Sequence, residues 1–378
     1  MTNINPTIRI NDQEFAFEAG ETILDVARRN GIDIPTLCHL KGAPSTGACR
    51  MCVVEVEGRP DLAAACHTPV EPKLVVRTET SHVVETRKTL IRLLWASGNH
   101  NCDVCRPPEY PAEGPQAEAV AGLECEDICP VWGECRLQEL AIRYGVVERR
   151  FKTPAPRYPL EDVNPFIVRD FGRCILCGRC VQACNDIQVN HAICFDYPAE
   201  ARKIVTAGDK PLKDSDCVFC GECVQACPTG ALVEKDVRYK VRPWEMQKVR
   251  TTCTYCGVGC QLYLHTRENR VVKVTGVEEA APNYGSLCVK GRFGFDFINS
   301  SDRLKTPLIK ENGSLREASW DEALKLVAAR LAGIQARHGA DSIGVLTSAR
   351  ITNEENYIAQ KFARAVLKTN NIDHCARL

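Results

Sequence analysis

The sequence has no excess of charge of either sign, few aromatic side chains and no long apolar run. Lysine plus arginine and aspartate plus glutamate number 48 each, and aromatic residues make up 6% of the chain. A nucleic-acid-binding surface needs a basic patch, which this balance does not indicate. No run of about 18 apolar residues predicts a membrane span. No G-x-G-x-x-G loop is present, so NAD chemistry is expected to need another subunit.

Cysteine, in contrast, occurs 23 times in 378 residues. The N-terminal stretch MTNINPTIRINDQEF is polar and shows no secretory signal, so we expect a reducing, cytoplasmic location. In a long chain of that compartment, clustered cysteines bind metals or carry out redox chemistry more often than they form disulfides.

Two cysteine runs, CILCGRCVQAC and CVFCGECVQACP, share the spacing C-x2-C-x2-C-x3-C. This run holds 4Fe–4S clusters in bacterial ferredoxins, where the fourth cysteine of each run ligates the cluster of the other run. The first predicted ligand set is therefore Cys174, Cys177, Cys180 and Cys227. The second is Cys217, Cys220, Cys223 and Cys184.

A separate cysteine group lies near the N-terminus and consists of Cys38, Cys49, Cys52 and Cys66. The close pair of Cys49 and Cys52 follows Gly47 and Ala48, whose small side chains let backbone N–H groups approach sulfide. The first gap is longer than in plant-type 2Fe–2S sites, and zinc is the alternative. Zinc sites usually contain two close cysteine pairs, so we predict a 2Fe–2S cluster.

A crowded segment between these groups contains six candidate ligands: His100, Cys102, Cys105, Cys125, Cys129 and Cys135. A 4Fe–4S cluster needs four of them, and zinc or surplus thiols are the alternative. A histidine ligand would replace a charged thiolate by a neutral donor and raise the potential of the cluster.

The last group consists of Cys253, Cys256, Cys260 and Cys288. Gly257 and Gly259 permit tight backbone turns around a further 4Fe–4S cluster, with zinc again the alternative. Cys194 and Cys375 remain, and both are expected to be small buried side chains.

Helical patterns are predicted over ETILDVARRNG, over residues 83–98 and over RLQELAIRYGV. Near the C-terminus, Ser319 and Thr352 each begin a capping-box pattern. The apolar stretch 343–347 between these two predicted helices indicates a buried strand, and the alternation suggests an α/β arrangement.

The segments TTCTYCGVGCQL and GSLCVKGRFGFDFINSSDRLKTPLI resemble the iron–sulfur segment that opens molybdopterin oxidoreductases, formate dehydrogenases in particular. In that family a lysine just after the fourth cysteine lies between the cluster and the pterin, and Lys290 matches it. NNIDHCARL is similar to the stretch that precedes the molybdenum-ligating cysteine or selenocysteine. The resemblance implies that this ligand would follow Leu378, so no catalytic residue is expected within the chain. In one hypothesis the ligand is a selenocysteine whose codon was read as a stop.

The order of all four groups is similar to the alpha subunit of cytosolic NAD-dependent formate dehydrogenases. The upstream part resembles the large iron–sulfur subunit of complex I and the N-terminal region of iron-only hydrogenases. One cluster of those relatives has the pattern His-x3-Cys-x2-Cys-x5-Cys. For the crowded segment the resemblance implies the ligands His100, Cys102, Cys105 and Cys135, with Cys129 as the rival.

We therefore predict an α+β multidomain protein. Its expected parts are a β-grasp 2Fe–2S domain (1–80), a small helical His/Cys-ligated 4Fe–4S domain (81–150), a two-cluster ferredoxin domain (151–240), a 4Fe–4S molybdopterin oxidoreductase domain (246–305) and an incomplete α/β molybdopterin domain (306–378).

The resemblance implies one 2Fe–2S and four 4Fe–4S clusters that relay electrons from formate oxidation. A molybdenum or tungsten bis-pterin guanine dinucleotide would bind only with the remainder of the molybdopterin domain. The electrons would pass to flavin- and NAD-binding diaphorase-type subunits. The alternative is an electron-relay adaptor, or a complex I-like iron–sulfur subunit, without pterin chemistry.

Overall fold

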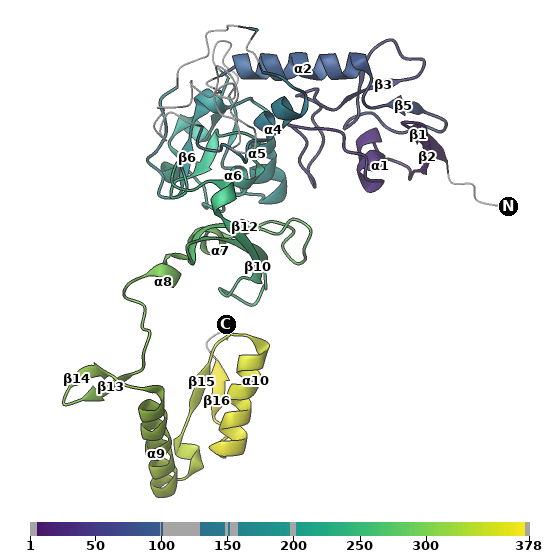
Figure 1. Cartoon of the computed structure of the whole chain (residues 1–378). Helices are drawn as coiled ribbons and strands as arrows, with labels where there is room; N and C mark the ends of the chain where they lie inside the picture. Colours follow the sequence, from purple (N-terminus) through teal and green to yellow (C-terminus); the bar gives the residue numbers. More distant parts are fainter. Residues whose placement is uncertain are drawn as a thin grey trace, which may run out of the picture. The chain divides into compact units, whose positions relative to one another are not determined.

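The computed structural model describes residues 6–98, 100, 129–147, 150–151, 158–196 and 202–374. It divides into two compact units, Met1–Gln247 and Lys248–Leu378 (Figure 1). The structure is mixed α/β, and its described strands form no closed barrel. None of the described helices has the length and apolar character needed to cross a bilayer.

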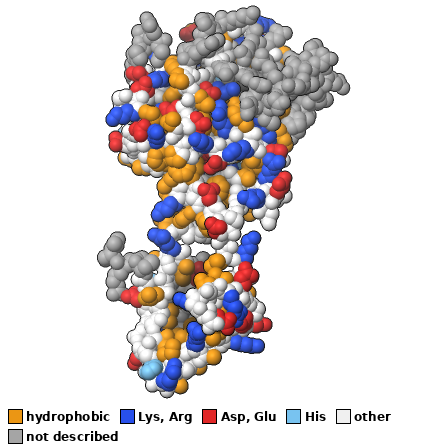
Figure 2. Space-filling model, turned by 90° about the vertical axis from the view of Figure 1, so that its left-hand side faces the viewer, with side chains coloured by type: hydrophobic (Ala, Val, Ile, Leu, Met, Phe, Trp, Pro, Cys, Tyr) orange, Lys and Arg blue, Asp and Glu red, His pale blue; other side chains and the backbone are white. Residues whose placement is uncertain are grey.

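Charged side chains of both signs are interspersed on the face of the molecule shown in Figure 2. Some of them form local ion pairs, such as that between Arg316 and Glu322 on the surface of the second unit. The even mixture agrees with the equal numbers of acidic and basic residues in the sequence.

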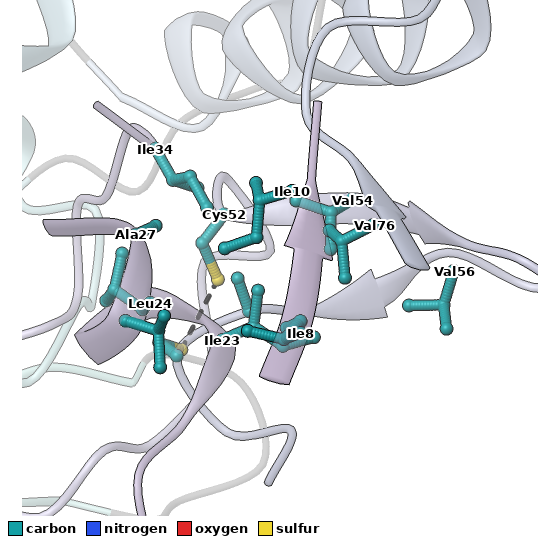
Figure 3. Close-up of a cluster of buried hydrophobic side chains, with 14 of the residues drawn as sticks. Ile8, Ile10, Ile23, Leu24, Ala27, Ile34, Cys52, Val54, Val56 and Val76 are labelled. Carbon is teal, nitrogen blue, oxygen red and sulfur yellow. Dashed lines mark hydrogen bonds between the residues drawn. The ribbon is translucent and has the colours of Figure 1, made fainter. Parts of the chain in front are cut away.

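The first unit opens with a five-stranded sheet in the order β2–β1–β5–β3–β4. Its strands are β1 (Thr7–Ile10), β2 (Gln13–Ala16), β3 (Val53–Val56), β4 (Ala63–Ala64) and β5 (Val75–Arg77). Strands β1 and β5 are parallel, and the other pairs are antiparallel. Helix α1 (Ile23–Arg29) places Ile23 and Leu24 in the same buried core as Ile8 and Val76 (Figure 3).

Helix α1 begins with a capping box. The Asp25 N–H donates to Thr22 Oγ1 at 3.3 Å, and the Thr22 N–H donates to Asp25 Oδ2 at 2.9 Å. These two bonds satisfy backbone donors that the helix itself cannot pair.

We expect Thr22→Ala to destabilise the first unit by about 0.5–2 kcal/mol, because it removes the N-cap acceptor. Thr89→Ala is the control, since Thr89 lies inside α2 and its hydroxyl donates to the Glu85 carbonyl at 3.0 Å without capping a helix end. Urea unfolding followed by circular dichroism compares the two variants. Equal stability of both would contradict the role assigned to the cap.

Helices α2 (Ser81–Ala96) and α4 (Arg136–Arg143) confirm two helices that the sequence predicts. Both pack into one buried core, in which Trp95 of α2 and Leu140 of α4 join Leu37 and Met51 from the N-terminal cysteine region. This core therefore connects the surroundings of two cysteine groups.

The ferredoxin-like part of the first unit is built from short elements. They are β6 (Ile167–Arg169), α5 (Arg179–Gln182), the π-helical turn η2 (Ala183–Ile187), β7 (Cys194–Phe195), β8 (Ile204–Val205), α6 (Glu222–Ala226) and β9 (Leu232–Glu234). Strands β6 and β9 pair antiparallel, as do β7 and β8. The expectation of a buried Cys194 is wrong, because strand β7 leaves its side chain exposed.

The second unit contains a three-stranded sheet of β10 (Gln247–Thr252), β11 (Gln261–Arg267) and β12 (Arg270–Gly276). Helices α7 (Val289–Phe293) and α8 (Asp296–Asn299) follow it. Leu262, Val274 and Leu287 form a small core there, and the Asn299 side chain donates to the Val271 carbonyl at 2.9 Å. The sheet and α7 thus carry the last cysteine group.

The remaining elements are β13 (Leu308–Glu311), β14 (Ser314–Glu317), α9 (Trp320–His338), β15 (Val345–Thr347), α10 (Asn353–Lys361) and β16 (Ile372–His374). Further short helical turns are η1 (Phe171–Arg173), η3 (Ala207–Asp209), η4 (Leu212–Asp214), η5 (Pro243–Glu245), η6 (Ala340–Ser342) and η7 (Phe362–Val366). Ser319 caps α9, and Thr352 and Glu355 form the predicted capping box of α10.

The predicted strand in 343–347 exists as β15, paired in parallel with β16, but the expectation that it is buried is wrong. Leu346 is 87% exposed, and Trp320 and Leu324 of α9 are exposed as well. The reason is that no other element among the described residues covers these side chains.

Candidate iron–sulfur sites

The structure brings the four N-terminal cysteines together beside the first sheet. Cys38, Cys52 and Cys66 are buried, and Cys49 is half-buried. The sulfur atoms of Cys52 and Cys66 are 3.3 Å apart (the dashed line in Figure 3). The Cys49 N–H donates to Cys38 Sγ at 3.5 Å. The loop turns at Gly47, whose φ of 61° favours glycine.

Hydrogen bonding makes the two sulfurs of each pair unequal. A bond from the Cys49 thiol lowers the pKa of Cys38 to about 5, and a bond from the Cys52 thiol lowers the pKa of Cys66 to about 6. The same bonds, together with burial, raise the pKa of Cys49 and Cys52. A bound metal would displace the remaining thiol protons. Four thiols with backbone donors fit the ligand chemistry of a 2Fe–2S cluster.

The two ferredoxin-type runs meet crosswise. Cys174, Cys177 and Cys180 line one apolar cavity together with Cys227 and Cys223 of the other run. Burial, together with the charge of nearby Cys227, raises the pKa of Cys174 to about 11 and of Cys177 to about 12. The predicted first ligand set is therefore brought together.

The second set has the same arrangement. Burial raises the pKa of Cys217 and Cys223, and Cys184 of the first run acts electrostatically on both. Cys184 Sγ also accepts a hydrogen bond from the Ala192 N–H at 3.3 Å. Electrostatic interactions fade with distance. Because Cys184 raises the pKa of both Cys217 and Cys223, it lies close to the second run.

The repeat extends to the backbone of the two loops. Leu176 and Phe219 occupy equivalent positions and have φ values of 52° and 53°, which are strained for side chains of this size. Each donates its N–H at 3.4 Å to the first sulfur of its run, Cys174 or Cys217. Such donors are the groups that tune a cluster's potential through its sulfur ligands.

The crowded segment is only partly described, since Cys102, Cys105 and Cys125 lie outside the described residues, as does Cys375. Cys129, Cys135 and His100 are buried. Burial raises the pKa of Cys135 to about 12, with further contributions from Cys129 and Cys227. The Cys135 sulfur lies 3.6 Å from the Pro228 carbonyl oxygen. Cys129 and Cys135 are thus neighbours, and no sequence pattern indicated that Cys135 lies beside the ferredoxin-type runs.

The last group surrounds the N-terminus of α7. Burial raises the pKa of Cys253 and Cys260, and Cys256 and Cys288 add to both shifts. The Cys253 N–H donates to the Cys260 carbonyl at 2.8 Å. Lys290, two residues beyond Cys288, is exposed on α7.

No three histidine, cysteine or carboxylate side chains within the described ranges are placed to hold a single metal ion. Iron–sulfur clusters distribute their protein ligands over two or four iron atoms.

Sequence analysis missed the buried arginines around these groups. Arg87, Arg173 and Arg242 are each less than 10% exposed, and Arg242 Nη1 donates to the Cys129 carbonyl at 2.9 Å. Arginine is mostly a surface residue, so its identity alone gives no indication of burial. For Arg87 a weak indication existed, because it shares a helix face with Val83 and Ile91.

Comparison with protein families agrees with the order of the cysteine groups. Four family models match: the 2Fe-2S iron-sulfur cluster binding domain (residues 5–81), the 4Fe-4S dicluster domain (173–231), the molybdopterin oxidoreductase Fe4S4 domain (246–300) and molybdopterin oxidoreductase (303–378). The expected sequence of 2Fe–2S, ferredoxin-type and molybdopterin-type domains is confirmed.

Similar proteins come from several redox systems. An NADH-quinone oxidoreductase chain of Rhizobium meliloti is 38% identical, and the putative formate dehydrogenase YrhE of Bacillus subtilis is 33% identical. The NADPH-Fe(3+) oxidoreductase subunit alpha of Geobacter sulfurreducens is 37% identical. Each match covers 98% of this chain, and the chain spans 40% of the length of these relatives.

Among solved structures, a chain of an NAD+-reducing NiFe hydrogenase in the H2-reduced state is similar, with a TM-score of 0.52 and 28% identity. The match covers 62% of this chain and 90% of the hydrogenase chain.

Proposed function

Because this chain is a homologue of formate dehydrogenases and of an NADH-quinone oxidoreductase chain, we propose that it is the electron-transfer portion of a molybdenum or tungsten formate dehydrogenase alpha subunit. It relays electrons from formate oxidation to an NAD-reducing partner. The observation that carries this proposal is the crosswise meeting of the two ferredoxin-type runs, which supports a pair of 4Fe–4S sites.

The proposed ligands are the five predicted sets that the four cysteine groups supply, one set for 2Fe–2S and four for 4Fe–4S. In the crowded segment, Cys135 remains a proposed 4Fe–4S ligand. The position of Cys129 near Cys135 supports Cys129 as a further candidate ligand. The finer domain division, with a β-grasp first domain and boundaries near residues 80, 150, 240 and 305, belongs to this proposal.

Iron–sulfur clusters, when bound, supply one-electron carriers whose potentials depend on their surroundings. The protein's residues bury or half-bury the thiols of the ferredoxin-type runs, direct the N–H groups of Leu176 and Phe219 at sulfur, and give the cavity around Cys174 an apolar lining. Burial and such hydrogen bonds are the means by which a protein sets cluster potentials.

The pterin end of the relay rests on the molybdopterin-type match and on the last cysteine group. Lys290 on α7 is proposed to lie between that group and a bound pterin, whose binding also requires the remainder of the molybdopterin domain. At the other end, flavin- and NAD-binding diaphorase-type subunits in the cytoplasm are the proposed electron acceptors.

Formate should bleach the iron–sulfur absorbance of the full-length protein that contains this chain, prepared without oxygen. Pterin and metal analysis on the same sample accompanies this measurement. Bound pterin with molybdenum or tungsten but no bleaching by formate would contradict the proposed substrate.

The second candidate is an electron-relay adaptor or complex I-like subunit without pterin chemistry. It is favoured by one observation, the higher identity to the NADH-quinone oxidoreductase chain (38%) than to the formate dehydrogenase (33%). Full-length protein that carries all its iron but neither pterin nor molybdenum nor tungsten would decide for this candidate.

A further inference from the structure

A fully buried arginine on α2 holds the loop of the first cysteine group. The Arg87 side chain is 0% exposed. Its Nε donates to the Met51 carbonyl at 3.1 Å, and its Nη2 donates to the Val53 carbonyl at 2.8 Å. Met51 and Val53 are the neighbours of Cys52 on either side. The guanidinium therefore fixes the backbone immediately before and after a proposed cluster ligand.

The remaining nitrogen of Arg87 connects to the helix that follows the crowded segment. Nη1 donates to the Tyr144 hydroxyl at 2.8 Å and to Glu79 Oε1 at 2.7 Å. The Tyr144 hydroxyl donates to Glu79 Oε1 at 3.2 Å. Tyr144 is the C-cap residue of α4, and Cys135 is its N-cap residue. One guanidinium thus contacts both the Cys52 loop and the helix that starts at Cys135.

A second arginine reinforces this connection. Arg143 of α4 lies 3.5 Å from Glu79 Oε1 and forms an ion pair with Asp33, which precedes Cys38 in the chain. Its guanidinium lies 5.5 Å from the centre of the Tyr144 ring, on which Arg87 also packs at 5.7 Å. We call these five residues the polar clasp: Asp33, Glu79, Arg87, Arg143 and Tyr144.

The clasp is suited to fixing a geometry rather than to adding stability. Ion pairs add little net stability here, because the buried Arg87 guanidinium loses its hydration and its partner Glu79 is 43% exposed. The planar guanidinium, however, donates well only to acceptors that are arranged to match the directions of its N–H groups. Tyr144 of the clasp belongs to the core in which Met51, Trp95 and Leu140 pack, so the loop and α4 share one packed core.

We propose that Arg87 is a positioning residue for electron transfer, fixing the separation between the cluster at Cys52 and the cluster at Cys135. Electron tunnelling between clusters depends steeply on their separation, so a fixed distance sets the rate of this step. The buried positive charge also favours the reduced, more negative state of the neighbouring 2Fe–2S cluster. This inference rests on the cluster assignment of the proposed function.

Arg87→Met and Lys88→Met form a matched pair on α2. Each removes one positive charge, but Lys88 forms a surface ion pair with Glu85 at 2.8 Å and takes no part in the clasp. Both variants of the full chain are purified without oxygen. Redox titration followed by EPR gives the 2Fe–2S potential, and the magnetic interaction of this cluster with its neighbour reports their separation.

Arg87→Met should lower the reduction potential of the 2Fe–2S cluster and weaken its magnetic interaction with the neighbouring cluster. Lys88→Met should leave both quantities as they are in the unmodified chain. Arg87→Lys keeps the positive charge but lacks the planar set of N–H donors. The 2Fe–2S potential should therefore be closer to that of the unmodified chain than the magnetic interaction is. Arg87→Met protein with its full iron content, an unchanged potential and an unchanged interaction would overturn the proposal.

If Arg87→Met fails to fold or to retain iron, Tyr144→Phe tests the positioning role of the clasp instead. It removes one hydroxyl from the clasp and keeps every charge, so the magnetic interaction should weaken with little change in potential. An unaltered interaction in this variant would also overturn the proposal. An unmodified chain without iron would contradict the proposed function itself, and this inference with it.

Discussion

Replacing Cys227 with alanine should remove the cluster of the first ferredoxin-type run, not that of its own run. The cavity places Cys227 with Cys174, Cys177 and Cys180, so the variant should lose about 4 iron atoms, the content of one 4Fe–4S cluster. Iron analysis and EPR of protein purified without oxygen measure the loss.

Double variants test the crosswise arrangement decisively. The iron losses of two replacements add when the residues hold different clusters and do not add when they hold the same cluster. Cys174→Ala combined with Cys227→Ala should still lose about 4 iron atoms, and Cys217→Ala combined with Cys227→Ala about 8. Cys194→Ala is the control, since this exposed cysteine belongs to no group and its removal should cost no iron. A loss of only about 4 iron atoms from the Cys217/Cys227 variant would contradict the arrangement.

Gly276→Ala should disrupt the second unit. A β-carbon at Gly276 would lie 1.9 Å from the Gly285 carbonyl oxygen and 2.5 Å from its carbon, so the two backbone segments must separate. Gly285 leads into Cys288, and the displaced loop should release the last cluster. We expect a loss of about 3 kcal/mol or more of stability, the upper end of overpacking costs, together with about 4 iron atoms.

Gly333→Ala is the matched control for this variant. Gly333 lies inside α9, where an added β-carbon meets nothing within 4 Å. Alanine is the better helix former, so this variant should gain about 0.5–1 kcal/mol and keep all its iron. Thermal unfolding and iron analysis compare the two. Normal iron content and stability in Gly276→Ala would show that the close contact with Gly285 is not maintained.

The sequence predicted most reliably what local spacing determines. The helices at α1, α2 and α4 follow from apolar periodicity and capping residues such as Thr22, all of which act within a few positions along the chain. The two ferredoxin-type cysteine runs are likewise set by local spacing, and the exchange of Cys184 and Cys227 that their pattern indicates stays a prediction. Such features need no knowledge of long-range contacts.

Features that depend on distant parts of the chain were missed. The clasp joins residues as far apart as Asp33 and Arg143, and no pattern in the sequence pairs them. The exposure of Cys194 and Leu346 was also not foreseen, because burial depends on which elements cover a strand and not on the apolar character of the strand. In the crowded segment, six candidates for four positions left the ligands undecided.

The most direct test of the central claim is iron, zinc and acid-labile sulfide analysis of the chain purified without oxygen, with EPR of the reduced sample. The account predicts brown protein with about 18 iron atoms, two from the 2Fe–2S cluster and sixteen from four 4Fe–4S clusters, and EPR signals of both cluster types. Colourless protein with zinc in place of iron and sulfide would contradict it.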